Sequence, residues 1–295
     1  MMNLLKNKID FAAIITVKHS NPNGDPLNGN MPRTTYNGHG EISDVCIKRK
    51  IRNRLLDMGE NVFVQSDDKK VDEFTSLRSR AEANAELKAA KGKEEYARIA
   101  CKSWIDVRSF GQVFAFKGKK DESGDGLSVG IRGPVSIHSA FSVDPVDITS
   151  IQITKSVNSE PTETAKKSSD TMGMKHRVDF GVYILKGSIN VQLAELTGFT
   201  EEDAEKIKEA IRTLFVNDAS SARPEGSMEL VKLYWWRHNN KIGQYSTAKV
   251  HNLLKVERKQ KTDAFGRTTS PSSIEDYEIV LDSLPGLTVD VYEGL

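Results

Sequence analysis

The first long apolar stretch, residues 9–18, alternates along the chain in a way that predicts a β-strand. After a polar loop the spacing of apolar positions changes to three and four residues. This change predicts an amphipathic helix that begins after Ser43 and ends at Gly59. The apolar positions of the strand and then of the helix are Phe11, Ala13, Ile15, Val17, Ile47, Ile51, Leu55 and Met58.

The remaining pattern predicts three more helical segments and several more strands. Residues 158–177 show no periodicity and are expected to form a long connection, and residues 259–273 are expected to form a surface loop. The predicted helices occupy residues 66–93 and 94–115 and a segment that begins at Thr200, and the strands occupy 127–131, 135–141, 148–157, 178–191, 228–236, 244–256 and 277–281.

Without its insertions, the chain has the order strand, helix, two strands, helix, strand. This β-α-β-β-α-β order predicts an α+β fold of the ferredoxin-like type, which includes the RNA-recognition-motif-like (RRM-like) fold. The two helices would cover one face of an antiparallel sheet and leave the other face partly open. Residues 1–295 are expected to form one such domain.

Composition narrows the class of protein. Hydrophobic residues make up 38% and charged residues 28% of the 295 residues, as in soluble globular proteins. No apolar run reaches the roughly 20 residues of a membrane-spanning helix, and no signal-peptide core is visible, so a cytoplasmic protein without membrane contact is expected. Two cysteines in unrelated contexts and six scattered histidines predict neither a disulfide framework nor a metal site, and no cofactor is expected.

Positive charge is concentrated at one place in a chain whose net charge is only +1. Five of the seven residues from Lys48 to Arg54 are Lys or Arg, which suits a phosphate backbone. A solvated helix face is the alternative interpretation of the same run.

The polar loop before this helix adds donors that suit a nucleic acid. Asn21 and Asn23 can donate to phosphate or a 2′-hydroxyl, and Gly24 allows a ligand close to the backbone. An ordinary polar turn is the alternative. The only aromatic residue of the first strand, Phe11, falls on its apolar face, so loops and helix ends rather than stacked strand aromatics are expected to bind RNA.

A second group of residues ends the long connection. Met172 and Met174 flank a glycine without apolar periodicity, and exposed apolar side chains of this kind can wedge between stacked bases. Lys175, His176 and Arg177 follow directly and can meet phosphate. Packing of both methionines against the core is the alternative.

Asp25 and Asp44 raise an enzymatic alternative. Two carboxylates near a basic helix could hold Mg²⁺ for phosphodiester cleavage by a metal-dependent ribonuclease that acts through Asp25. No third acidic residue stands at a telling spacing, and Asp44 lies where a helix N-terminus favours an anion in any case.

Five segments together resemble the repeated backbone subunit of Cascade, the CRISPR surveillance complex, of the type I-C subtype. The resemblance extends from about residue 10 to residue 295. The segments that carry it are residues 20–26, 43–54, 128–134, 172–180 and 217–226.

The resemblance implies a hand-shaped, non-catalytic protein. Its RRM-like palm would carry a helical finger insertion at residues 66–98 and a thumb insertion at residues 155–178. Copies would stack head to tail along one CRISPR RNA, beside other Cascade subunits, and display the spacer for pairing with a target DNA strand in antiviral defence. Each thumb would flip a guide nucleotide, with Met172 or Met174 as its wedge.

Thirteen residues are expected to bind RNA on this interpretation. They are Asn21, Asn23, Lys48, Arg49, Arg52, Gln112, Arg132, Met172, Met174, Lys175, His176, Arg177 and Arg223.

Overall fold

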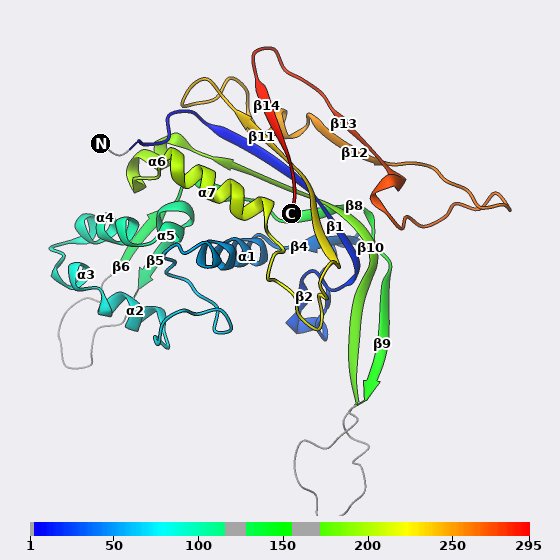
Figure 1. The fold of residues 1–295 in the computed structure, drawn as a ribbon, viewed down its shortest axis with the longest axis horizontal. Coiled ribbons are helices and arrows are strands. Elements are labelled where there is room, and N and C mark those ends of the chain that lie inside the picture. The colour runs from blue at the N-terminus through cyan, green and yellow to red at the C-terminus, as the bar shows by residue number, and fades with distance from the viewer. Residues whose placement is uncertain (1–2, 116–127, 155–171) are drawn as a thin grey trace, which may run out of the picture.

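A central antiparallel sheet organises the molecule (Figure 1). The structure is a computed structural model that describes residues 3–115, 128–154 and 172–295. Its longest strand is β10 (Met172–Ile189), which pairs with the short strand β7 (Val135–Ile137) and with β9 (Ile148–Thr154) in addition to its neighbours in the main strand order. In spatial order the sheet strands are β14 (Thr288–Glu293), β11 (Met228–Arg237), β1 (Ile9–Ser20), β10 (Met172–Ile189), β8 (Ala140–Pro145) and β4 (His39–Ile42).

β1 lies at the centre of the sheet and is buried on both faces. Phe11 and Ile15 pack under α1 (Asp44–Asp57) and α7 (Glu201–Arg212). Ala12 and Ile14 are equally buried on the opposite face, beneath α8 (Thr247–His251) and the two-stranded sheet of β12 (Leu254–Arg258) and β13 (Tyr277–Leu281). The expectation of a partly open face is therefore wrong, because the C-terminal segment covers it.

The two helices of the first face begin at the predicted caps. Ser43 Oγ accepts a hydrogen bond from Cys46 N (3.4 Å), and Gly59 follows the helix with a φ of 84°. Thr200 and Asp203 form a reciprocal capping box at the start of α7. A short helix, α6 (Val191–Thr197), precedes α7 and was not predicted.

The region between α1 and β6 (Ser128–Arg132) has an apolar cluster of its own. In it the Phe63 ring packs in tilted geometry against the rings of Trp104 and Phe114, with centroids 4.6 and 5.0 Å away. The predicted helix at 66–93 is confined to α2 (Leu77–Ala83) and α3 (Ala85–Ala89). The next predicted helix divides into α4 (Lys93–Ser103) and α5 (Ile105–Phe110) and ends at residue 110, because β5 (Gly111–Ala115) pairs with β6 instead.

β10 begins earlier than the sequence predicts. Residues 172–178 pair with β9 in a two-stranded ribbon that extends beyond the sheet (Figure 1), although residues 158–177 were expected to lack structure. Partner hydrogen bonds rather than apolar periodicity make this segment a strand. The tip of the expected thumb falls within residues 155–171, outside the described residues.

The C-terminal third also departs from the expected strands. The predicted strand at 244–256 divides into α8 and β12, and β14 was not predicted. Residues 259–273 form the expected surface loop, and a 3-10 turn, η2 (Ile274–Asp276), joins that loop to β13. None of the helices in the described ranges has both the length and the hydropathy to cross a membrane.

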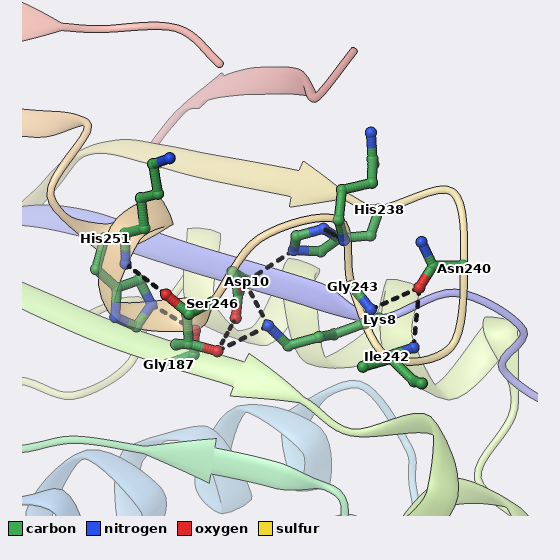
Figure 2. A network of polar contacts seen from close by, with 12 residues as sticks. Lys8, Asp10, Gly187, His238, Asn240, Ile242, Gly243, Ser246 and His251 are labelled. Carbon is green, nitrogen blue, oxygen red and sulfur yellow. Dashed lines mark hydrogen bonds and ion pairs between the residues drawn. The ribbon is translucent and has the colours of Figure 1, made fainter. Parts of the chain in front are cut away.

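A buried polar network attaches this C-terminal layer to β1 (Figure 2). The fully buried carboxylate of Asp10 accepts hydrogen bonds from Lys8 Nζ (2.8 Å) and Thr247 Oγ1 (2.9 Å). His238 Nε2 lies 2.9 Å from the same carboxylate, and His238 Nδ1 accepts the backbone N–H of Gln244 (2.9 Å). Because Nδ1 is an acceptor, Nε2 carries the proton and donates it to Asp10.

Candidate nucleic-acid interface

Most cations of the basic helix α1 are paired with carboxylates. Arg49 differs, because it is exposed and has no ion pair within the part of the chain that the structure describes. The paired cations are Lys48 with Asp44 (3.1 Å), Lys50 with Asp218, Arg52 with Asp106 (3.0 Å) and Arg54 with Asp57 (2.8 Å).

Arg52 has a structural partner. Its Nε donates to Asp106, which is fully buried and also accepts the backbone N–H groups of Phe63 (2.7 Å) and Val64 (3.0 Å). The guanidinium also lies 5.1 Å from the centre of the Phe110 ring. Arg52 therefore stabilises the fold, because removing it would leave the buried carboxylate of Asp106 without its charge partner. The predicted phosphate contact would have to compete with this ion pair.

Lys50 and Arg223 share the carboxylate of Asp218. The side chain of Lys50 is 1% exposed, and burial lowers its pKa against the opposing effect of Asp218. Arg223 Nε lies 3.4 Å from the same carboxylate. The cluster joins α1 to the loop after α7, and Arg223 takes part in that junction.

The loop after β1 uses its predicted donors internally. Asn21 is 3% exposed, and its amide nitrogen donates to the backbone of Asn30 (2.7 Å). Asn23 Oδ1 accepts from both the backbone N–H (2.9 Å) and the hydroxyl (2.7 Å) of Ser43. The side chain of Asn21 is thus a scaffold element rather than a phosphate donor, and Asn23 fixes the loop to the start of α1.

Hydrogen bonds and ion pairs join the loop after β1, the helix α1 and the loop after α7. Asn23 joins the loop to α1, the backbone N–H of Asn21 donates to Ala222 O (2.9 Å), and Asp218 joins the later loop to Lys50. We call these segments, residues 20–25, 43–54 and 217–226, the three-segment junction. The sequence singled out all three segments but not Asp106 and Asp218, since no local pattern marks a distant ion-pair partner.

Asp25 has the role of a turn residue. Its carboxylate accepts the backbone N–H of Leu27 (3.2 Å), caps the 3-10 turn η1 (Pro26–Asn28) and lies 3.4 Å from Arg33 Nη2. Asp44 pairs with Lys48 in the first turn of α1. Within the described ranges no three His, Cys, Asp or Glu side chains gather as metal ligands do. The geometry gives the ribonuclease alternative no support.

The β9–β10 ribbon separates residues that the sequence grouped together. Alternate residues of a strand point to the same face, so Met172 and Met174 lie with His176 on one face of the ribbon. Lys175 and Arg177 lie on the other face. Met172 is 60% and Met174 55% exposed, so the expectation of exposed methionines is confirmed and their packing against the core is excluded.

The cationic face of the ribbon also carries two apolar side chains that the sequence did not single out. Ile151 is 39% and Ile153 49% exposed, and Ile151 lies opposite Lys175. Arg177 Nε lies 3.8 Å from Asp179 at the base of the ribbon. Lys175 is the exposed cation of this face.

Gln112 and Arg132 lie at one end of the β5–β6 hairpin. Arg132 is exposed and stands opposite Gly111, whereas Gln112 stands opposite Ile131 and donates to Val113 O (3.0 Å). The hairpin follows α5, whose Phe110 contacts Arg52, so this end of the hairpin lies beside α1.

Comparison with known proteins gives the family. The family model described as CRISPR-associated protein Cas7 matches residues 7–282. A curated relative from Haloferax volcanii, "CRISPR-associated protein Cas7", is 24% identical over 269 residues, which cover 85% of this chain and 75% of the relative.

Two solved structures with surveillance-complex names match this chain at lower similarity. A chain of a "CRISPR RNA-guided surveillance complex, pre-nicking" has a TM-score of 0.47 and 16% identity over 78% of each chain. A chain of a "CRISPR RNA-guided surveillance complex" has a TM-score of 0.41 and 18% identity over 78% of this chain and 68% of that one. Because the family model spans nearly all of the sequence, this protein belongs to the CRISPR-associated Cas7 family.

Proposed function

We propose that this protein is a backbone subunit that binds CRISPR RNA in a surveillance complex of the type I-C subtype. Membership of the Cas7 family is the observation that carries the proposal. The subunit would polymerise head to tail along the guide in the cytoplasm, beside other Cascade subunits, and display the spacer to a target DNA strand. It would not be catalytic.

The order of the central strands supports an RRM-like palm. Taken along the chain, β1, β8, β10 and β11 are the four strands of a β-α-β-β-α-β unit, with α1 and α7 on one face. On this proposal residues 1–295 are one palm domain, residues 66–98 lie in its finger, and residues 155–178 form its thumb.

The guide backbone would lie across the three-segment junction. Arg49 is its exposed cation and has no ion pair among the described residues, and Lys48 is the next most accessible because its ion pair with Asp44 is near the surface. Arg132 would add a contact from the neighbouring hairpin. Contacts to phosphate need no base readout, which suits a protein that must hold any spacer sequence.

The ribbon would act on the nucleic acid of a neighbouring subunit. Met172 and Met174 supply exposed apolar side chains on one face, which suits insertion between bases. Lys175 and Arg177 point from the opposite face and would meet a different surface. The thumb would therefore have a wedge side with Met172, Met174 and His176, and a cationic side.

Co-expression with a CRISPR array tests the proposal. The wild-type protein is expected to purify with RNA of defined length, visible in the ratio of absorbance at the nucleic-acid and protein maxima. Arg49→Glu is expected to lower the RNA retained severalfold, because it replaces a phosphate contact by a repulsion. Lys93→Glu changes an exposed lysine on α4 by the same charge and serves as the matched control.

Two outcomes would contradict the proposal. The first is wild-type protein that purifies free of RNA despite the array. The second is cleavage of the bound RNA that requires Mg²⁺ and disappears in Asp25→Ala, because that result belongs to a ribonuclease.

A further inference from the structure

The loop between β12 and β13 forms an arm that is not part of the guide-binding site proposed at the three-segment junction. This arm, residues 258–273, reaches the right edge of the described chain in Figure 1. Phe265 stands on it with 82% of its surface exposed. No other large hydrophobic residue occurs between residues 258 and 273, so the ring is isolated among polar and charged neighbours.

The turn that carries Phe265 is internally fixed. Asp263 accepts the backbone N–H groups of Phe265 (2.8 Å) and Arg267 (2.9 Å) and the Arg267 Nε (3.0 Å). Gly266 has a φ of 76°, which few other residues adopt without strain. The Arg267 guanidinium lies 5.2 Å from the ring centroid. These bonds fix the backbone of the turn on which the exposed ring stands.

A groove of about 510 Å³ lies at the base of the arm, between the arm and β8. Arg258 and Lys259 line it and donate to the backbone carbonyls of Thr269 and Glu275. Glu257 lines it as well. Asp144 also lines the groove, and its buried Oδ2 has no hydrogen-bond partner among the described residues. The groove thus holds two cations, Arg258 and Lys259, beside the carboxylates of Asp144 and Glu257.

We propose that the arm is a second nucleic-acid contact, which binds a single strand by stacking a base on Phe265 and holding phosphate at Arg258 and Lys259. Every base has a π-face, so an exposed ring on the same arm as two cations suits a single strand of any sequence. The inference rests on the proposed function for the presence of nucleic acid in the complex.

The arm and the three-segment junction lie on opposite faces of the sheet. β12 and β13 pack over Ala12 and Ile14, whereas α1 packs over Phe11 and Ile15. A protein partner fits the arm less well, because docking surfaces need contiguous apolar area and Phe265 has no apolar neighbours along the loop. The strand at the arm is therefore distinct from the guide segment held at the three-segment junction.

Fluorescence polarisation with the RNA-loaded full-length protein tests the arm. The probes are labelled 20-nucleotide oligothymidine DNA and oligouridine RNA, with a guide complementary to neither. Phe265→Ala is expected to weaken binding of at least one probe about tenfold, the size of one lost base–aromatic stack. Arg258→Gln with Lys259→Gln is expected to lower the slope of log affinity against log salt by roughly 1 to 2.

Ile242→Ala is the matched control, because Ile242 is 79% exposed on a loop away from the arm. Greater loss for DNA would support a target or displaced strand as the ligand, and greater loss for RNA would support a flanking part of the guide. Unchanged affinity for both probes, or an equal loss in the control, would overturn the inference. Guide RNA retention is scored in the same samples, so a failure of the arm is separable from a failure of the guide-binding function.

Discussion

Arg49 and Arg52 are three residues apart on α1, yet their surroundings give them different roles. Arg49 projects into solvent, whereas Arg52 is 14% exposed and bonds to the fully buried Asp106. A sequence shows how many cations a helix carries but not how many remain available to a ligand. On α1 most of them pair with carboxylates, so fewer remain available to a ligand than the charge run suggests.

Stability measurements separate these two arginines. Arg52→Glu is expected to lower the free energy of unfolding by about 3–5 kcal/mol, because it places a second negative charge beside Asp106 in the protein interior. Arg49→Glu is expected to change it by less than about 0.5 kcal/mol. Urea unfolding followed by circular dichroism measures both. Equal stabilities of the two variants would refute the assignment of Arg52 to the fold.

The β9–β10 ribbon shows how a strand distributes side chains that are adjacent in sequence. Residues 172–177 contain two methionines and three basic residues, which the chain alone presents as one contact patch. Pairing with β9 sends alternate side chains to opposite faces, so Met174 and Lys175 point away from one another. An element with two different faces can contact two partners at once.

Nuclease protection of guide RNA tests this division. The double variant Met172→Ala with Met174→Ala is expected to lose the regular protection ladder of the assembled complex, because the wedge is removed. Ile151→Ala with Ile153→Ala removes apolar surface from the opposite face of the same ribbon and is expected to keep the ladder. A wild-type ladder in the methionine variant would count against the wedge assignment.

At the scale of the whole molecule, the C-terminal layer encloses the central sheet. Leu254 and Tyr277 pack on Ile14 and Trp236 and bury the face that an RRM-like palm of minimal size would expose. Asp10 fixes this layer from beneath, since its partner Thr247 begins α8 and its partner His238 accepts a hydrogen bond from Gln244, three residues earlier. The sheet face that this layer covers is thus unavailable for base stacking.

The Asp10 network predicts a specific dependence of stability on pH. Burial alone would raise the pKa of Asp10, but hydrogen bonds from His238, Lys8 and Thr247 and the charge of Lys8 outweigh it and lower the pKa below its ordinary value. A lowered pKa in the folded state contributes stability above the unfolded value of about 3.9. That contribution is lost as the pH falls through the folded pKa.

Asp10→Asn is therefore expected to lower the free energy of unfolding by about 3 kcal/mol at pH 7 and to reduce its decline below about pH 4. Urea unfolding at several pH values between 3 and 7 measures both effects. Glu94→Gln neutralises an exposed carboxylate on α4 and is the control, with an expected change below about 0.5 kcal/mol. An acid decline as steep as that of the wild type would exclude Asp10 as its source.

The sequence by itself determined the features that depend on neighbours along the chain. Apolar spacing and caps located β1, α1 from Ser43, α7 from Thr200 and β11, because periodicity and capping are local. Motif resemblance over nearly the whole chain indicated the family, and the family model confirms Cas7 membership. The subtype and the individual RNA contacts remain proposals.

Only the tertiary structure decided which charges are free and which faces are covered. Asp106 is 54 residues from Arg52 and Asp218 is 168 residues from Lys50, so no window of sequence links them. Likewise Gly111–Ala115 and residues 172–177 became strands because β6 and β9 supply backbone partners, against the local pattern. Pairing, ion partners and burial depend on distant segments meeting, and that meeting is a property of the folded chain.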